Sequence, residues 1–232
     1  MVFQTEPGVR VRRVGISRSP LRGMRRNSRT VPLSKLAFDK VFASFALVFL
    51  APVIGLIAVT ILLTEGGPVF FGHQRVGLGG RRFKCLKFTS MCQNADQRLA
   101  QVLEHDPDAR AEWQSTRKLT NDPRISALGA VLRKTSLDEL PQLWNVLRGD
   151  MSIVGPRPIV MDEAEFYGPY FSDYLSVLPG VTGAWQVSGR SDTTYEQRVA
   201  LDVDYIRSRG FFGDIKIVLK TVAVILKRDG AR

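Results

Sequence analysis

Two adjacent carboxylates, Asp138 and Glu139, stand between two arginines in the stretch from Leu119 to Pro158. Arg133 precedes the pair, and Arg157 follows it between two prolines. Proline fixes its own φ and pushes the preceding residue into an extended conformation, so Arg157 should hold its guanidinium in a set direction, where it can bind phosphate oxygens. This arrangement is typical of a phosphate site, although on local sequence alone a surface acid pair at the start of an ordinary soluble helix is the simpler interpretation.

The local pattern also predicts the helix that positions the acid pair. Residues 136–139 fit a Ser-x-x-Glu capping box, but Pro141 would clash with the preceding turn unless it lay in the first turn of the helix. This favours Asp138 at or beside the N-cap of a helix that runs to about Leu147 and stops at Gly149. A carboxylate at a helix N-terminus is stabilised in its charged form by roughly 0.3–1 kcal/mol. We therefore expect Asp138 to be ionised and available as a nucleophile.

A metal ion is the expected partner of the acid pair. Two neighbouring carboxylates would repel a diphosphate unless a cation intervened, and Mg²⁺ prefers oxygen ligands and retained waters. We therefore predict that Asp138 and Glu139 bind Mg²⁺. The two histidines, His73 and His105, are too few and too far apart in the sequence to indicate a zinc site or a histidine-based triad.

Several motifs resemble one known family. They are Leu-Arg-Lys-Thr-Ser-Leu-Asp-Glu-Leu-Pro-Gln-Leu from Leu132, Gly-Asp-Met-Ser-Ile-Val-Gly-Pro-Arg-Pro from Gly149, and the shorter runs His-Gln-Arg-Val-Gly, Pro-Gly-Val-Thr-Gly and Gln-Val-Ser-Gly-Arg. In this order they resemble the bacterial sugar transferases, the monotopic polyprenyl-phosphate phosphoglycosyl transferases. The resemblance extends from about Lys35 to the C-terminus.

The resemblance implies a specific reaction. Members of this family transfer a sugar 1-phosphate from a UDP-sugar to undecaprenyl phosphate, which starts exopolysaccharide assembly. By this resemblance Asp138 would form an aspartyl phospho-sugar intermediate, Glu139 would orient the metal or a substrate, and Arg133 and Arg157 would support the carboxylates and phosphates. The length and the short basic N-terminus are most similar to the stand-alone transferases of succinoglycan-type synthesis, so UDP-galactose or UDP-glucose is the expected donor.

Four further residues are expected to bind phosphate or substrate. Lys84 and Lys87 lie on a predicted strand close to the phosphates, and the resemblance places Gln186 and Arg190 on the active-site side. One position departs from the family. Where the family usually reads Lys-Phe-Arg-Thr-Met, this chain has Thr89 in place of the arginine. The departure leaves open an inactive paralogue that binds the donor without turnover.

An uncharged apolar run, VFASFALVFLAPVIGLIAVTILL, extends from Val41 to Leu63. About 20 such residues suffice to cross the hydrocarbon core, so a single straight span is one interpretation. However, Pro52 near the centre should kink the helix, and basic residues flank both ends, which favours both ends in the cytoplasm. We therefore predict a re-entrant helix that breaks at Pro52, as in the resembled family.

The expected fold is mainly α with a short β-hairpin in residues 65–91, and three segments are predicted: a disordered basic segment (1–34), a re-entrant membrane helix (35–64) and a cytosolic catalytic domain (65–232). The net charge of +11 points to anionic partners. We expect a UDP-sugar, undecaprenyl phosphate and anionic lipid, without nucleic acid, at the cytoplasmic face of the inner membrane. The alternative is a non-catalytic, membrane-anchored basic adaptor that binds nucleic acid or anionic lipid.

Overall fold

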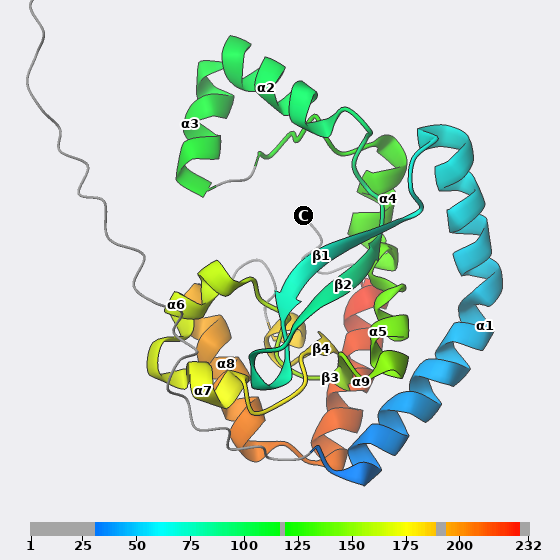
Figure 1. Ribbon diagram of the computed structural model, residues 1–232, viewed down its shortest axis with the longest axis vertical. Coiled ribbons are helices and arrows are strands. Elements are labelled where there is room, and N and C mark those ends of the chain that lie inside the picture. Colours follow the sequence, from blue (N-terminus) through cyan, green and yellow to red (C-terminus); the bar gives the residue numbers. More distant parts are fainter. Residues whose placement is uncertain (1–30, 117–118, 189–193, 228–232) are drawn as a thin grey trace, which may run out of the picture.

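This computed structural model describes residues 31–116, 119–188 and 194–227, and most of them are helical (Figure 1). The mainly α fold with one short hairpin, expected from the sequence, is therefore confirmed. The basic segment expected to be disordered lies outside the described residues except for residues 31–34, and so does Arg190.

The apolar run forms one long helix, α1 (Leu33–Glu65), which curves along one side of the molecule in Figure 1. The expected break is not present: the helix continues through Pro52, because one lost hydrogen bond bends a helix without ending it. Among the described residues it is the one helix long and apolar enough to cross a membrane. Large apolar side chains on its outer face, including Val48, Phe49 and Leu63, are exposed.

Both halves of α1 nevertheless pack against the rest of the chain. In the first half, Ala43 is fully buried in a core cluster with Val146 and Val154. In the second half, Ile61 is fully buried beside Phe88 and Leu132. The inner face of the helix is therefore part of the core along its whole length.

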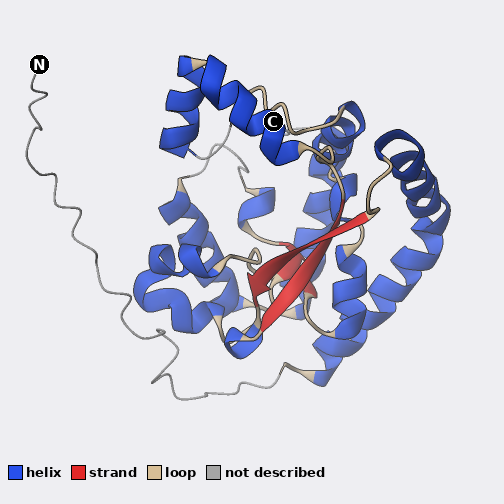
Figure 2. Ribbon diagram, turned by 45° about the horizontal axis from the view of Figure 1, so that its top comes forward, coloured by secondary structure: helices blue, strands red, loops and turns tan. Residues whose placement is uncertain are grey.

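The hairpin predicted around the glycine turn is confirmed, with antiparallel strands β1 (Phe70–Val76) and β2 (Arg82–Phe88). Figure 2 shows these strands crossing the middle of the molecule with helices around them. A second sheet pairs β3 (Ser152–Val154) with β4 (Gly180–Thr182) in parallel. The close approach of Gly155 and Gly180 leaves no room for a side chain at either position.

A helical arm follows the hairpin. It consists of α2 (Ala95–His105) and α3 (Pro107–Thr116), which lie apart from the other helices in Figure 1. The two helices are separated at Asp106, whose carboxylate accepts hydrogen bonds from the backbone N–H groups of Asp108 and Ala109. The chain then returns to the body through α4 (Ala127–Thr135).

The acid pair does not cap a helix, so that prediction was wrong. Ser136 has φ 58° and ends α4, Asp138 and Glu139 lie in a single 3-10 turn (Leu137–Glu139), and α5 (Gln142–Arg148) begins only after Pro141. Ser136 is left-handed rather than extended as an N-cap residue usually is, and its side chain makes no capping hydrogen bond, so the predicted capping box does not form. The predicted end of the helix is confirmed at Gly149, which has φ 80°.

The remaining elements close the body around the second sheet. They are α6 (Ala164–Tyr167), α7 (Phe171–Tyr174), α8 (Tyr195–Ser208) and α9 (Phe211–Lys227). Tyr167, Phe171 and Tyr174 form a second core cluster with Val199 and Val203 of α8. Phe166 and Tyr170, which lie in the same stretch of the chain, are exposed.

Candidate active site

The acid pair meets a lysine from the hairpin. Lys87 Nζ lies 3.2 Å from Asp138 Oδ2 and 2.6 Å from Glu139 Oε1. The contact exists because β2 packs directly against the 3-10 turn, with Phe88 and Leu132 buried next to it. One ammonium group therefore neutralises part of the charge of two adjacent carboxylates.

The environment of Asp138 sets its charge state. Its side chain is buried, and this burial is the largest influence on its pKa, which is raised above the usual value; Glu139 raises it further. Lys87 and Arg133 act in the opposite direction. Burial also acts to lower the pKa of Lys87, but the Glu139 and Asp138 carboxylates outweigh it and raise that pKa. The lysine therefore stays charged and favours the ionised form of Asp138.

A small cavity of about 20 Å³ opens beside this ion pair. Its lining includes cationic, anionic and amide side chains: Arg75, Lys87, Glu139, Gln142, Arg157 and Gln186. Cys85 also lines the cavity, but burial raises the pKa of its thiol to about 11, so it is protonated at neutral pH and a poor nucleophile. The arrangement can therefore bind an anionic group next to the acid pair.

Arg157 is held in this cavity by its neighbours. Its guanidinium lies over the Trp185 ring, 5.7 Å from the centroid. Next to its Pro158, Ile159 donates its N–H to the Tyr174 hydroxyl, which itself donates to the Val76 carbonyl. These two bonds join the Pro-Arg-Pro segment to the end of β1.

A buried carboxylate lies behind Arg157. Asp202 of α8 is almost completely buried and accepts a hydrogen bond from the Tyr167 hydroxyl at 2.8 Å. Burial raises its pKa to about 7, while Tyr167 and Arg157 act against that rise. Asp202 therefore links Tyr167 of the second core cluster to Arg157 of the cavity.

The other residues expected from the sequence lie in different places. Arg133 donates from Nε to Ser90 Oγ at 2.9 Å and influences Asp138 only through its charge. Lys84 is exposed and does not line the cavity. Thr89 donates its hydroxyl to the Pro68 carbonyl at the end of the hairpin, so it holds two chain segments together.

Sequence reasoning did not single out Arg75 and Gln142 of the cavity lining, nor Asn145, which holds α5 against β2. Arg75 lines the cavity and pairs with Glu163 at 3.4 Å, and its motif His-Gln-Arg-Val-Gly was the signal that could have identified it. Asn145 accepts from the Leu86 N–H at 2.9 Å and donates to the Lys84 carbonyl at 2.8 Å, which fixes α5 to the edge of β2. A buried asparagine that bridges two elements has no local sequence signature.

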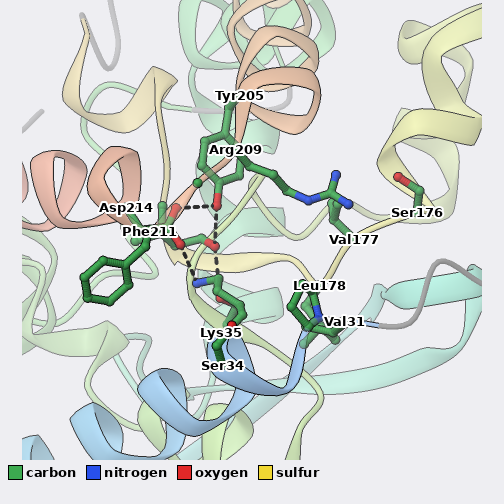
Figure 3. A pocket seen from close by; sticks show the side chains of 14 residues that line it. Val31, Ser34, Lys35, Ser176, Val177, Leu178, Tyr205, Arg209, Phe211 and Asp214 are labelled. Atoms are coloured by element: carbon green, nitrogen blue, oxygen red, sulfur yellow. Dashed lines mark hydrogen bonds and ion pairs between the residues drawn. The ribbon is translucent and has the colours of Figure 1, made fainter.

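A larger cavity of about 260 Å³ lies elsewhere, between the starts of α1 and α9 (Figure 3). Its walls are mostly apolar, and at its base Lys35 Nζ lies 3.0 Å from both Asp39 and Asp214. Tyr205 donates to Asp214 at 2.8 Å. Neither acid of the 138–139 pair lines this cavity, so the chemistry is assigned to the smaller one.

The fold and the site agree with one family, and comparison with known proteins shows it. The bacterial sugar transferase family matches residues 30–228, and the chain belongs to this family.

Individual relatives are similar over most of this chain. It is 50% identical over 197 residues to the exopolysaccharide production protein ExoY of Rhizobium meliloti, covering 84% of this chain and 87% of the relative. It is 51% identical over 197 residues to the UDP-galactose-lipid carrier transferase of Erwinia amylovora, covering 85% of this chain and 41% of that protein. It is 56% identical over 167 residues to the undecaprenyl-phosphate galactose phosphotransferase of Salmonella typhimurium, covering 72% of this chain and 35% of that relative. The chain thus spans most of the first relative and less than half of the other two.

Proposed function

We propose that this transferase moves a sugar 1-phosphate from a UDP-sugar to undecaprenyl phosphate and so initiates exopolysaccharide synthesis. The observation that carries the proposal is the contact of Lys87 with both Asp138 and Glu139, beside a cavity that also holds Arg75 and Arg157. Relatives named for UDP-galactose, UDP-glucose and undecaprenyl phosphate support the substrate class, and make UDP-galactose or UDP-glucose the proposed donor.

In the first step, an Asp138 carboxylate oxygen attacks the phosphorus that carries the sugar. The bond from this phosphorus to the bridging oxygen breaks, and UMP leaves with that oxygen and its electron pair. The product on the enzyme is an aspartyl phospho-sugar. Arg75 and Arg157 offset the negative charge of the pyrophosphate, and Lys87 favours the ionised form of the attacking carboxylate.

In the second step, an oxygen of undecaprenyl phosphate attacks the same phosphorus. The bond to Asp138 breaks, the carboxylate is regenerated, and the product is undecaprenyl diphosphate sugar. This double displacement needs a nucleophile that is shielded from water. Asp138 meets that requirement because the residue is only 6% exposed.

Mg²⁺ is the proposed cofactor. In the described residues no cluster of three metal-binding side chains occurs, but Mg²⁺ is often held by one or two carboxylates together with substrate phosphates. Asp138 and Glu139 fit this role, because both already converge on a single cation, the Lys87 ammonium. When bound there, the ion would neutralise charge on the pyrophosphate.

We also propose that α1 enters and leaves the cytoplasmic leaflet of the inner membrane without crossing it, with a bend at Pro52. The start of α1 is tied to α9 by the ion pair of Lys35 with Asp214, and its end is tied to the body by a hydrogen bond from Gln93 to the Glu65 carbonyl. A body with so many charged groups cannot sit in the hydrocarbon core. Two ends attached to one body therefore favour the re-entrant topology over a straight span, with the site facing the cytoplasm and anionic lipid as a further partner.

The direct test is UMP release by the purified protein with undecaprenyl phosphate, Mg²⁺ and a panel of UDP-sugars. Release that depends on both the lipid acceptor and one UDP-sugar is expected. Binding of nucleic acid in a gel-shift assay without any UMP release would instead favour the adaptor, and donor binding without release would favour the inactive paralogue.

A further inference from the structure

The Gln186 side chain carries an unused acceptor in the active-site cavity. Its Oε1 is buried and has no hydrogen-bond partner among the described residues. A buried polar atom is normally paired, so such an exception calls for a partner. Because Gln186 lines the cavity with Arg157, Lys87 and Glu139, the missing partner belongs to whatever fills this space.

The orientation of the amide is fixed by a second contact. Gln186 Nε2 donates to the Val181 carbonyl at 3.2 Å, and a flipped amide would place two acceptors against each other. The neighbouring Gly183 leaves the space that Oε1 occupies, since a Cβ at that position would lie 3.0 Å from it. Oε1 is therefore the unpaired acceptor of a side chain that lines the cavity.

An acceptor oxygen selects the chemistry of its ligand. Gln186 Oε1 cannot accept a hydrogen bond from a pyrophosphate oxygen, because neither phosphate of a UDP-sugar carries a proton at neutral pH. With Mg²⁺ proposed at Asp138 and Glu139, the group that meets Oε1 is a hydrogen-bond donor, which in a UDP-sugar means a hydroxyl or the uracil N3–H.

The position of the cavity favours a hydroxyl of the transferred sugar over a group of the uridine. The cavity is lined by Arg75, Lys87 and Arg157, which we assign to the phosphates, and the sugar is bonded directly to the reacting phosphate. We infer that Gln186 Oε1 accepts a hydrogen bond from a hydroxyl of the transferred sugar, which makes Gln186 a specificity-determining residue; this rests on the proposed function for the identity of the donor.

Binding rather than turnover tests this inference, so that a failure of the proposed reaction remains separate. Calorimetry on the full chain in nanodiscs would first find the UDP-sugar that binds most tightly, then measure its monodeoxy analogues and its N3-methyluridine analogue. The wild type should bind one deoxy analogue roughly 10- to 100-fold more weakly than the parent sugar. Gln186→Met, which keeps the length of the side chain without the acceptor, should weaken binding of the parent by a similar factor and bind that deoxy analogue and the parent equally.

The matched control is Gln101→Met, an exposed glutamine of α2 that is not part of the cavity and should behave as wild type. Gln186→Met that still discriminates against the same deoxy analogue would overturn the inference. A variant that loses only discrimination against N3-methyluridine would overturn it as well and assign Oε1 to the base. If calorimetry supports the inference while no UMP is released, the proposed reaction fails alone.

Discussion

Lys87 Nζ lies 3.2 Å from Asp138 Oδ2, so the second strand of the hairpin supplies the counter-ion of the carboxylate that we propose as nucleophile. Lys87→Met should lower UMP release by roughly 100-fold or more, because the two carboxylates would then repel each other and would also repel the pyrophosphate. Steady-state UMP release measures this effect.

The same strand offers the matched control. Lys84→Met removes an equal charge at an exposed position outside the cavity and should leave UMP release close to wild type. Equal losses in the two variants would mean that the strand acts only through its general positive field.

Arg157 should depend on its planar shape as well as its charge. Arg157→Lys keeps the charge but loses the fork and the stacking on Trp185, so UMP release should fall strongly, by roughly 10- to 100-fold. Arg124→Lys is the control, because Arg124 also stacks on a tryptophan, Trp113, but lies away from the cavity. Similar rates for wild type and Arg157→Lys would show that only charge matters.

Asp202 should make stability depend on pH. Its pKa is about 7 in the folded protein against 3.8 as the usual value, so the folded state favours the protonated form. The contribution of Asp202 to the free energy of unfolding is complete below pH 3.8 and is lost as the pH rises to about 7. The total loss is roughly 4 kcal/mol at most.

Thermal unfolding in nanodiscs at pH 5 and pH 8 measures this change. The Asp202→Asn side chain cannot ionise. The melting temperature of this variant relative to that of wild type should therefore be higher at pH 8 than at pH 5. Tyr167→Phe, which removes the hydroxyl that donates to Asp202, reports the cost of the hydrogen bond alone. Parallel pH profiles for wild type and Asp202→Asn would contradict the assignment.

Sequence patterns predicted those features of the fold that depend on local rules. Alternating apolar residues around glycines gave the hairpin, and Gly149 gave the end of α5. The start of that helix was mispredicted because Ser136 adopts a left-handed conformation, which is uncommon for a residue other than glycine and has no sequence signature.

The candidate site was predictable in its parts but not in its contacts. Asp138, Glu139 and Arg157 could be named from their motifs, whereas the choice between Lys84 and Lys87 depends on which face of β2 meets the acid pair. The unpaired acceptor of Gln186 could not be predicted from the sequence either. It is identified as Oε1 only because Nε2 donates to the Val181 carbonyl in the structure.

The re-entrant topology can be tested in intact cells. After replacement of Cys85 and Cys92, single cysteines placed near Ser28 and near the C-terminus should both resist an impermeant reagent added from the periplasm. Pro52→Leu should straighten α1 and shift a fraction of the molecules toward a spanning topology, with activity falling in proportion. Periplasmic labelling of either site in the chain with Pro52 intact would refute the re-entrant arrangement.

The covalent intermediate is the central claim, and intact-protein mass spectrometry tests it most directly. Incubation with the UDP-sugar donor and Mg²⁺ but without lipid should add the mass of one sugar phosphate, which maps to Asp138 and disappears when undecaprenyl phosphate is supplied. Asp138→Asn should give neither the adduct nor turnover while keeping its fold, whereas the exposed Asp162→Asn should behave as wild type. UMP release without an adduct, or near-normal turnover by Asp138→Asn, would contradict the account.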